Sequence, residues 1–337
     1  MIARRAFALS LAFLLGGCSG IQSALGRDGR HGEIFGGLFA IFLAVTLFVY
    51  LIVIAFLLAG IFRRRGKRQD GLPDEEGESR EASLRKGLIG WAAFIALGLS
   101  VLTVASFVAD RLMAQASGPD PLRIQIVAHQ WWWEVRYEDA DPSRTFRTAN
   151  ELHLPVGVPV QITLMSNDVI HSFWVPNLAG KQDLIPGRTT QIALHPTREG
   201  VYRGQCAEYC GLQHARMALD VTVEPVAAFR TWRTQQLLPA PLPRTPLQQA
   251  GLRYVETREC GACHSIVGTR ASGQVAPDLT HLASRRTIGA GTYPMSRGHL
   301  YAWVADPQSA KPGNRMPHIP LEPDQLHAIV AYLETLR

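Results

Sequence analysis

Two long apolar stretches near the start of the chain interrupt an otherwise mixed pattern of hydrophobic and polar positions. The first runs from about Ile34 to Phe62 and the second from about Leu88 to Ala109, and neither contains a charged residue. A helix needs ~20 apolar residues to cross a bilayer. The pattern therefore predicts transmembrane helices at 34–62 and 88–109, joined by a polar loop at 63–87.

Basic residues indicate how this pair of helices crosses the membrane. The polar loop begins with a cluster of Arg and Lys between Arg63 and Arg68. Loops rich in these residues stay on the cytoplasmic side. We therefore place the loop in the cytoplasm and everything after Ala109 outside. The expected location is the bacterial cell (inner) membrane, crossed more than once, with the later domains on the periplasmic side.

A further apolar segment lies at the start of the chain. Two arginines precede the run Ala6–Leu15, which is the pattern of a secretory signal peptide over 1–17. The segment ends Leu15-Gly16-Gly17-Cys18, which resembles a bacterial lipobox, so Cys18 is predicted to be lipidated. Ordinary cleavage near this point is the alternative.

After the second apolar run the pattern changes to short alternating segments. A linker-like Gly118-Pro119-Asp120-Pro121 comes first. Multiple short strands separated by turn residues then predict an all-β sandwich or barrel over 119–224. The clearest alternating segments are Arg123–Val127, Val158–Leu164, Gln191–Leu194 and Ala218–Val223.

The end of the chain has the pattern of a separate small domain. Residues 225–247 are rich in proline, which predicts a semi-rigid linker. Residues 248–337 then read as a helical domain that opens with a helix at about Leu247–Glu259. It closes with a helix from about Pro323, in which Leu326, Ile329, Val330 and Leu333 fall on one face.

Composition restricts the class of protein. Of 337 residues, 47% are hydrophobic and only 18% are charged, which fits membrane segments better than one large soluble core. The net charge is +6, but no basic patch is interleaved with aromatic residues, which argues against nucleic-acid binding. The cysteine count of 5 is odd and does not suit a disulfide framework.

One short run of the β region offers two thiols, an imidazole and a thioether. It reads Cys206-Ala-Glu-Tyr-Cys210-Gly-Leu-Gln-His214-Ala-Arg-Met217, and His171 upstream could supply a second imidazole. Soft sulfur ligands together with imidazole favour copper, and a mononuclear blue-copper site needs only one Cys. Two thiolates can bridge two metals with one imidazole for each, so we predict a dinuclear copper centre. The alternatives are a disulfide or a zinc site, although zinc sites do not use Met.

A second motif lies in the helical region. Cys260-Gly261-Ala262-Cys263-His264 is the attachment signature of c-type haem, in which the thiols form thioethers with the porphyrin and His264 binds the iron. A thioredoxin-like motif is the alternative, but the directly following His and the lack of a βαβ pattern disfavour it. A downstream Met or His should be the second axial ligand. We predict Met316, with Met295 next; the other candidates are His281, His299 and His318.

The copper loop resembles the CuA loop of cytochrome c oxidase subunit II, a Cys-x-Glu-x-Cys-x3-His-x2-Met pattern with an upstream His, and every position is matched. Nearly the whole mature chain resembles that subunit in its bacterial form with a fused cytochrome c domain. The resemblance implies a multidomain, membrane-anchored protein: a two-helix transmembrane hairpin, an all-β cupredoxin-like sandwich and an all-α class I cytochrome c domain. The implied CuA ligands are the side chains of His171, Cys206, Cys210, His214 and Met217 and the backbone carbonyl of Glu208.

The resemblance also implies roles for two other side chains. Trp131, in the segment His129–Trp133, is similar to the residue at which electrons enter the family's copper domain, whereas adjacent aromatics in general more often fill cores and interfaces. The Glu208 carboxylate is implied to help hold Mg²⁺ at the contact with subunit I, since carboxylate oxygen suits that ion. A solvent-facing acidic side chain is the alternative.

The function implied by the resemblance is electron transfer. Electrons would pass from cytochrome c or another periplasmic donor through haem c and CuA to subunit I, which carries haem a and the haem–CuB site, in an oxidase that also has a subunit III. That oxidase reduces oxygen to water and pumps protons. Because both predicted sites are ligand-saturated, this chain by itself should not reduce oxygen.

Three other readings remain to be compared with this one. Nitrous oxide reductase also uses CuA but needs a large propeller domain, and quinol oxidase subunits lack the copper ligands. A copper chaperone or assembly lipoprotein would hold copper in an exposed site and would need no covalent haem.

The slight basic excess of 248–337 and the slight acidic excess of 119–224 predict weak, salt-sensitive docking of the two outer domains.

Overall fold

The computed structural model describes residues 20–64, 76–114, 118 and 120–337. The chain divides into two compact units, one formed by Ile34–Gln115 and the other by the remainder of the chain. The predicted signal peptide and Cys18 lie outside the described residues.

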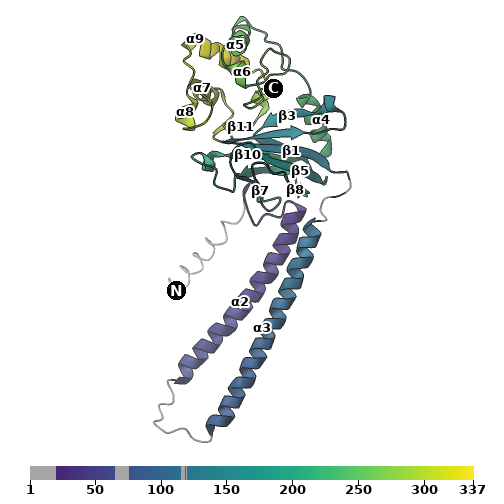
Figure 1. Ribbon diagram of the computed structural model, residues 1–337, viewed down its shortest axis with the longest axis vertical. Helices are drawn as coiled ribbons and strands as arrows, with labels where there is room; N and C mark the ends of the chain where they lie inside the picture. Colours follow the sequence, from purple (N-terminus) through teal and green to yellow (C-terminus); the bar gives the residue numbers. More distant parts are fainter. Residues whose placement is uncertain (1–19, 65–75, 115–117, 119) are drawn as a thin grey trace, which may run out of the picture. The chain divides into compact units, whose positions relative to one another are not determined.

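The first unit contains two long helices, α2 (Arg30–Arg64) and α3 (Glu76–Ala114) (Figure 1). Both contain stretches long and apolar enough to cross a membrane, Arg30–Phe62 with a mean hydropathy of 3.1 and Glu81–Met113 with 2.2. Both helices extend past the charge-free runs, because the flanking polar residues continue the hydrogen-bonded helix. The polar loop expected at 63–87 is therefore shorter than predicted.

The second unit begins with a β-sandwich, here called the β-domain (residues 120–236). Its strands are β1 (Leu122–His129), β2 (Trp132–Tyr137), β3 (Phe146–Ala149), β4 (Glu151–Pro155), β5 (Val160–Ser166), β6 (His171–Phe173), β7 (Gln182–Leu184), β8 (Thr190–Leu194), β9 (Gly200–Gln205) and β10 (Ala218–Glu224). One sheet has the order β3-β2-β1-β5-β8, the other has the order β4-β10-β9, and β6 pairs with β7. The alternating segments of the sequence correspond to β1, β5, β8 and β10.

Alternation along these strands forms the core between the sheets. In β1 the side chains of Ile124 and Ile126 are fully buried, as are those of Ile162 and Leu164 in β5. The two strands run parallel, and their register pairs Ile124 with Ile162 and Ile126 with Leu164. The apolar face that the period-two pattern predicts is therefore the inner face of the sandwich.

A helix occupies the first half of the expected proline-rich linker at 225–247. This helix, α4 (Val226–Gln236), buries Phe229 and sets the ring of Trp232 against Tyr137 and Phe146. Residues 226–236 form a helix because its aromatic face can be buried on the β-domain. The proline content of the whole segment does not predict this burial.

Trp232 also stacks on His153, with 4.1 Å between ring centroids. His153 Nδ1 lies 2.9 Å from Glu224 Oε1, and its Nε2 lies 3.8 Å from Glu151 Oε2. Burial acts to lower the pKa of His153, but its hydrogen bonds with the two carboxylates outweigh burial and raise the pKa from 6.5 to about 9. His153 is therefore expected to carry a positive charge at neutral pH.

This charge predicts a loss of stability at alkaline pH. A folded-state pKa above the unfolded value gives stability that is fully present below pH 6.5 and is lost as the pH rises through about 9. We expect the free energy of unfolding of the β-domain to fall by on the order of 3 kcal/mol over this window. Denaturant titrations of the full chain in detergent at pH 6 and pH 10 measure it. The His153→Gln variant should lack this pH dependence. If the free energy of unfolding fell equally between pH 6 and pH 10 in both proteins, the raised pKa of His153 would be contradicted.

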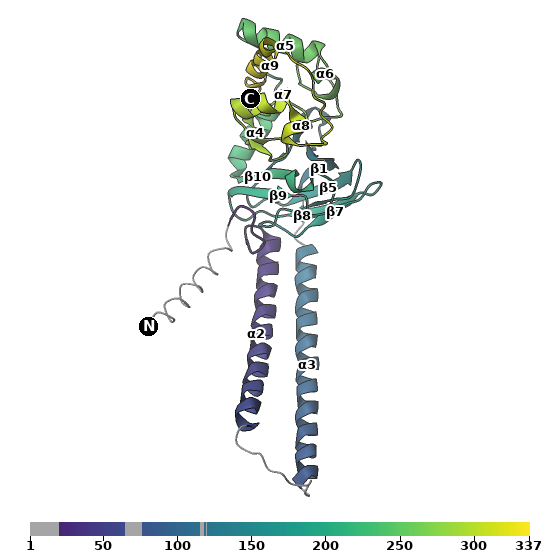
Figure 2. The same cartoon turned by 90° about the vertical axis from the view of Figure 1, so that its left-hand side faces the viewer.

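The rest of the second unit is a helical domain (residues 246–337), which both views place beside the β-domain (Figures 1 and 2). Its longest helices, α5 (Pro246–Thr257) and α9 (Pro323–Leu333), pack directly on one another. A Cβ added to Gly251 would lie 2.0 Å from the carbonyl oxygen of Ala328, so this crossing requires glycine. The other elements are α6 (Cys260–Cys263), α7 (Arg297–Ala305), α8 (Pro307–Ala310), β11 (Thr287–Ile288) and β12 (Tyr293–Pro294).

Candidate functional site

The loop between β9 and β10 gathers the sulfur and imidazole side chains. Cys206 follows β9 directly and Met217 precedes β10, and the N–H of Cys206 donates to the carbonyl of Met217 at 2.9 Å. His171 enters from the first position of β6. The β-sheet therefore fixes both ends of the loop and places the upstream imidazole against it.

The predicted copper ligands lie together in one cluster. Cys206 Sγ is 3.7 Å from Cys210 Sγ, 3.8 Å from His171 Nδ1 and 3.3 Å from the carbonyl oxygen of Glu208. Cys210 Sγ is 3.6 Å from His214 Nδ1 and 3.9 Å from Met217 Sδ. Each imidazole therefore faces a different sulfur of the pair.

These distances decide between the alternatives. A disulfide requires ~2.05 Å between sulfurs, and the 3.7 Å found here excludes one in this structure. Zinc sites take four tetrahedral ligands without Met, whereas this cluster has two imidazoles on opposite sides of two sulfurs and a thioether. The donor set fits a pair of soft metal ions that share the sulfurs, with one imidazole each.

The electrostatics of the cluster favour a thiolate. The hydrogen bond with Cys210 outweighs burial and lowers the pKa of Cys206 to about 3, helped by His171. The same contact, together with burial, raises the pKa of Cys210. Cys206, Cys210, His171 and Met217 are each at most 3% exposed, so the cluster is shielded from water.

Asp168 orients the upstream imidazole. Its Oδ1 lies 2.9 Å from His171 Nε2, which leaves Nδ1 facing Cys206. Burial acts to raise the pKa of Asp168, but the hydrogen bonds from His171 and from backbone N–H groups lower it to about 2. A carboxylate behind a ligating imidazole is the usual device that fixes its orientation. This role was not predicted from the sequence, although Asp168 is only three residues from His171.

Trp131 connects the copper loop to the helical domain. Its indole N–H donates to the carbonyl of Cys210 at 2.9 Å, and the side-chain amide of Gln130 donates to the same oxygen at 2.8 Å. A Cβ added to Gly313 of the helical domain would lie 3.9 Å from the Trp131 ring. The predicted electron-entry residue therefore lies against a domain of its own chain.

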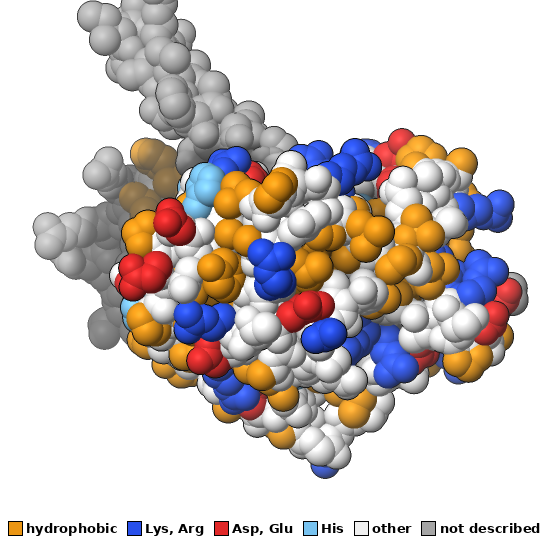
Figure 3. Space-filling view, turned by 90° about the horizontal axis from the view of Figure 1, so that it is seen from above, with side chains coloured by type: hydrophobic (Ala, Val, Ile, Leu, Met, Phe, Trp, Pro, Cys, Tyr) orange, Lys and Arg blue, Asp and Glu red, His pale blue; other side chains and the backbone are white. Residues whose placement is uncertain are grey.

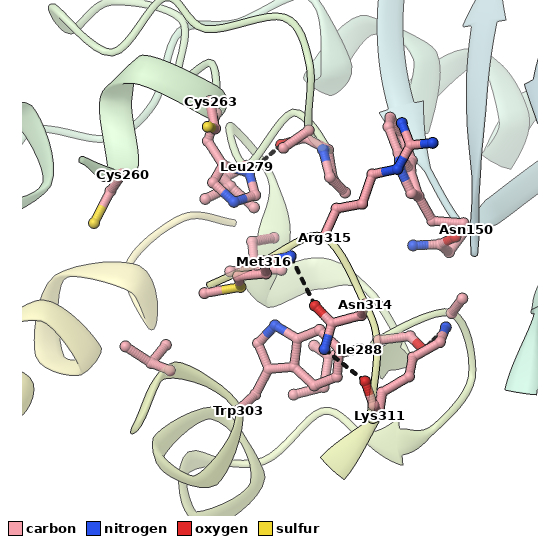
Figure 4. A pocket seen from close by; sticks show the side chains of 18 of the residues that line it. Asn150, Cys260, Cys263, Leu279, Ile288, Trp303, Lys311, Asn314, Arg315 and Met316 are labelled. Atoms are coloured by element: carbon pink, nitrogen blue, oxygen red, sulfur yellow. Dashed lines mark hydrogen bonds between the residues drawn. The ribbon is translucent and has the colours of Figure 1, made fainter. Parts of the chain in front are cut away.

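A cavity of about 440 Å³ separates the haem motif from this tryptophan. Cys260, Cys263, His264 and Met316 line it, together with apolar side chains such as Leu279, Ile288 and Trp303 (Figure 4). His264 Nδ1 lies 2.7 Å from the carbonyl oxygen of Pro277, so Nδ1 carries the hydrogen. Burial lowers the pKa of His264, so the ring is neutral and Nε2 is available as a ligand. Volume, lining and donors fit a covalently attached haem.

The candidates for the second axial ligand differ in whether they line the cavity. Met316 lines the cavity, whereas Met295 packs in the core of the helical domain and is absent from the described lining. The side chain of His281 faces the carbonyl of Leu238, and that of His299 faces Ser296. These two histidines and His318 also lie outside the lining.

The two outer domains meet through ion pairs and through buried contacts. Arg285 Nε and Arg315 Nη2 of the helical domain lie 3.5 Å from Glu151 Oε1 and 3.3 Å from Asp168 Oδ2 of the β-domain, and these pairs have the sign that the two charge excesses predict. Lys311 Nζ donates to the carbonyl oxygens of Trp131 and Arg216 in the β-domain at 2.7 and 2.8 Å, and to that of Gly289 in its own domain at 3.1 Å. Burial lowers the pKa of Lys311 to about 7. Because buried contacts are screened much less than exposed ones, the salt sensitivity of this docking should come mainly from the largely exposed Arg315. No local sequence pattern marks the role of Lys311.

The family "Cytochrome C oxidase subunit II, periplasmic domain" matches residues 140–224, and the family "Cytochrome c" matches residues 248–337. Cytochrome c oxidase subunit 2 of Alkalihalophilus pseudofirmus is 30% identical over 337 residues, which cover 98% of this chain and 96% of the relative. The protein of the same name from Bacillus sp. strain PS3 is 28% identical, with 82% and 80% covered.

A solved structure is also similar. The periplasmic domain of subunit II of cytochrome oxidase from Bradyrhizobium japonicum is 27% identical, with a TM-score of 0.33, and the match covers 36% of this chain and 96% of that chain.

Proposed function

Because the chain belongs to the cytochrome c oxidase subunit II family, we propose that it carries electrons, one at a time, from an external donor through haem c and CuA to catalytic subunit I. The observation that supports this route is the junction between the two sites. Gln130 and Trp131 both line the haem-motif cavity, and both donate to the carbonyl of Cys210 in the copper cluster. One short segment therefore touches both centres.

The proposed ligands follow from the distances. Cys260 and Cys263 would hold the haem, with His264 and Met316 as axial ligands. His171, Cys206, Cys210, His214, Met217 and the Glu208 carbonyl would hold the copper pair. When bound, the two groups supply one-electron redox couples. The protein contributes a buried cage that leaves no position open for a substrate, which also separates this role from that of a copper chaperone.

The partners follow from the family and from the helices. Two candidate membrane spans fit a membrane-anchored protein, and we propose a bacterial cell membrane with both outer domains on the periplasmic side. Subunit I would receive the electrons, and a subunit III would complete the complex. Glu208 Oε2 lies 3.9 Å from Lys181 Nζ, so a Mg²⁺ at this carboxylate would need its other ligands from subunit I.

The helical domain offers a site for the external donor. Val275 lines the haem-motif cavity and is 72% exposed. The outer face of this domain shows apolar patches between scattered Lys and Arg side chains (Figure 3). We propose that a cytochrome c or another small redox protein docks there, because Trp131 is already in contact with the helical domain.

Trp131 provides a specific test of the junction. The Trp131→Phe variant keeps an aromatic ring but loses the N–H that reaches the Cys210 carbonyl, so we expect haem-to-copper transfer to slow about tenfold, equivalent to ~1.4 kcal/mol of barrier. Flash-induced absorbance changes measure this rate. Trp232→Phe is the matched control, because Trp232 stacks on His153 and lies outside the described lining of the cavity. Equal rates in the two variants would contradict the proposed junction.

The proposed route itself is tested in the assembled oxidase. After rapid mixing of the oxidised complex with a reduced donor, haem c should be reduced before CuA, and CuA before the haem of subunit I. Reduction of CuA before haem c would overturn the proposed order.

A further inference from the structure

Both outer domains build the haem-motif cavity. The helical domain supplies the attachment motif and most of the apolar lining. The β-domain supplies the remaining wall, which consists of His129, Gln130, Trp131, Trp132, Asn150 and Asn167. The cavity is therefore complete only when the two domains are in contact.

The two ends of the cavity differ in chemistry. Cys260 and Cys263 lie at one end and Asn150 lies toward the other (Figure 4). Glu259, next to the attachment cysteines, is the only carboxylate among the described residues that line the cavity. The lining also includes the basic residues Arg285, Lys311 and Arg315. The end next to the β-domain is therefore suited to an anionic group.

The covalent structure of haem decides which group reaches that end. The two vinyl groups that form thioethers and the two carboxylates leave opposite halves of the porphyrin. A haem joined to Cys260 and Cys263 through its vinyl carbons would carry its carboxylates on the side away from α6. The wall that contains Asn150 would then be within their reach.

Asn150 has a donor in position for a carboxylate. It is 9% exposed, and its Oδ1 accepts a hydrogen bond from the backbone N–H of Trp133 at 2.9 Å. This bond fixes the orientation of the amide, so Nδ2 points into the cavity (Figure 4). Nδ2 has no hydrogen-bond partner among the described residues of the chain. A donor that faces the cavity, with its orientation fixed and without a protein partner, is available to a bound acceptor.

Arg285 also lines the cavity, from the helical domain. It is 6% exposed, and its Nη2 donates to the carbonyl of Asp278 at 2.6 Å. Its Nε forms a buried ion pair at 3.5 Å with Glu151 Oε1, and Glu151 follows Asn150 in the β-domain. This ion pair holds the guanidinium beside the wall that contains Asn150.

We propose that Asn150 of the β-domain binds a carboxylate of haem c across the domain boundary, so that the β-domain forms part of the haem site. This inference rests on the proposed function, because it requires haem attached at Cys260 and Cys263. Its consequence is that a residue of the copper domain influences how readily the haem accepts an electron. Donors that compensate the carboxylate charge reduce its stabilisation of ferric haem and so favour the ferrous form.

The Asn150→Asp variant tests the proposal in the full-length chain. Aspartate keeps the acceptor for Trp133 and tolerates the positive φ of 60° at this position, but it replaces the donor with a second carboxylate oxygen. At the wild-type midpoint potential and pH 8, we expect the ratio of reduced to oxidised haem to fall about threefold or more. The effect should shrink as the pH falls, because a proton can then bridge the two carboxylates. Optical redox titration measures the ratio, and resonance Raman should show a shifted carboxylate bending band.

Gln191→Glu is the matched control, because it changes the charge by the same amount as Asn150→Asp. Gln191 is exposed on β8 and lies outside the cavity lining. If Asn150→Asp does not attach haem, Asn150→Gly removes the donor at a backbone conformation that glycine adopts freely. The Asn150→Gly variant should also lower the ratio of reduced to oxidised haem and shift the same Raman band.

The outcomes separate the two proposals. Haem that is attached but whose redox ratio and carboxylate band are unchanged in both Asn150 variants would overturn the carboxylate site and leave the proposed function intact. A wild-type chain that carries no covalent haem after expression with the haem-attachment machinery would instead overturn the proposed function.

Discussion

A Cys210→Ser variant will lose the dinuclear copper signal and will pass electrons to subunit I at least ~100-fold more slowly, because the loss of a side chain that binds the metal should have a larger effect than the 10–100-fold typical of residues that only orient such a ligand. Cys210 Sγ contacts Cys206, His214 and Met217, so its loss removes the group that the two metals would share. Serine is too hard a ligand to replace thiolate for copper. Electron paramagnetic resonance and copper analysis of the purified chain measure the first effect, and steady-state oxidation of donor by the assembled oxidase measures the second.

The matched control changes the neighbouring glutamate. We expect Glu208→Gln to retain both coppers, because the proposed ligand is the backbone carbonyl, which lies 3.3 Å from Cys206 Sγ, and the substitution leaves it in place. Loss of copper from Glu208→Gln, or a normal dinuclear signal in Cys210→Ser, would contradict the proposed ligand set.

The second large effect concerns the axial ligand of the haem. In Met316→Leu we expect a five-coordinate or water-ligated, high-spin ferric haem, because leucine fills similar volume without a donor. Thioether ligation raises haem potentials, so at the wild-type midpoint the ratio of reduced to oxidised haem should fall by at least ~10-fold. Absorption spectra of the full chain measure the spin state, and redox titration measures the ratio of reduced to oxidised haem.

Met295→Leu is the control for this variant. Met295 packs in the core of the helical domain and not along the cavity, so the substitution conserves volume and should leave the haem spectrum unchanged. A high-spin haem in Met295→Leu together with a normal spectrum in Met316→Leu would reverse the assignment.

The sequence was sufficient for the broad architecture. Charge-free runs predicted the two apolar helices, and the alternation at Arg123–Val127 and Ala218–Val223 predicted strands of the sandwich. Two apolar N-terminal helices, a cupredoxin-like β-sandwich and a helical cytochrome c domain are confirmed. Strand β2 was not predicted, because the segment His129–Trp133 was interpreted mainly through the role of Trp131, whereas Trp133 is 1% exposed and belongs to the core.

The ligand motifs were also accessible from the sequence, because ligands on one loop keep a fixed spacing. The helix α4 could not be predicted from the sequence, because its stability depends on the surface of the β-domain that Trp232 covers. The contacts between the outer domains were least accessible. Lys311 and Asn150 act through partners that are far away in the sequence, and each looks like an ordinary polar residue in its local context. The opposite charge excesses predicted electrostatic docking, and the ion pairs Arg285–Glu151 and Arg315–Asp168 have the predicted sign, but charge counting could not predict the buried contact of Lys311 with the Trp131 carbonyl.

The most direct test of the whole account is the metal and haem content of the purified full-length chain, measured with its electron paramagnetic resonance spectrum. The account predicts two coppers for each covalent haem c, and one unpaired electron shared between the two coppers. Fewer than two coppers per folded chain after full reconstitution, or the signal of an isolated mononuclear copper, would contradict it.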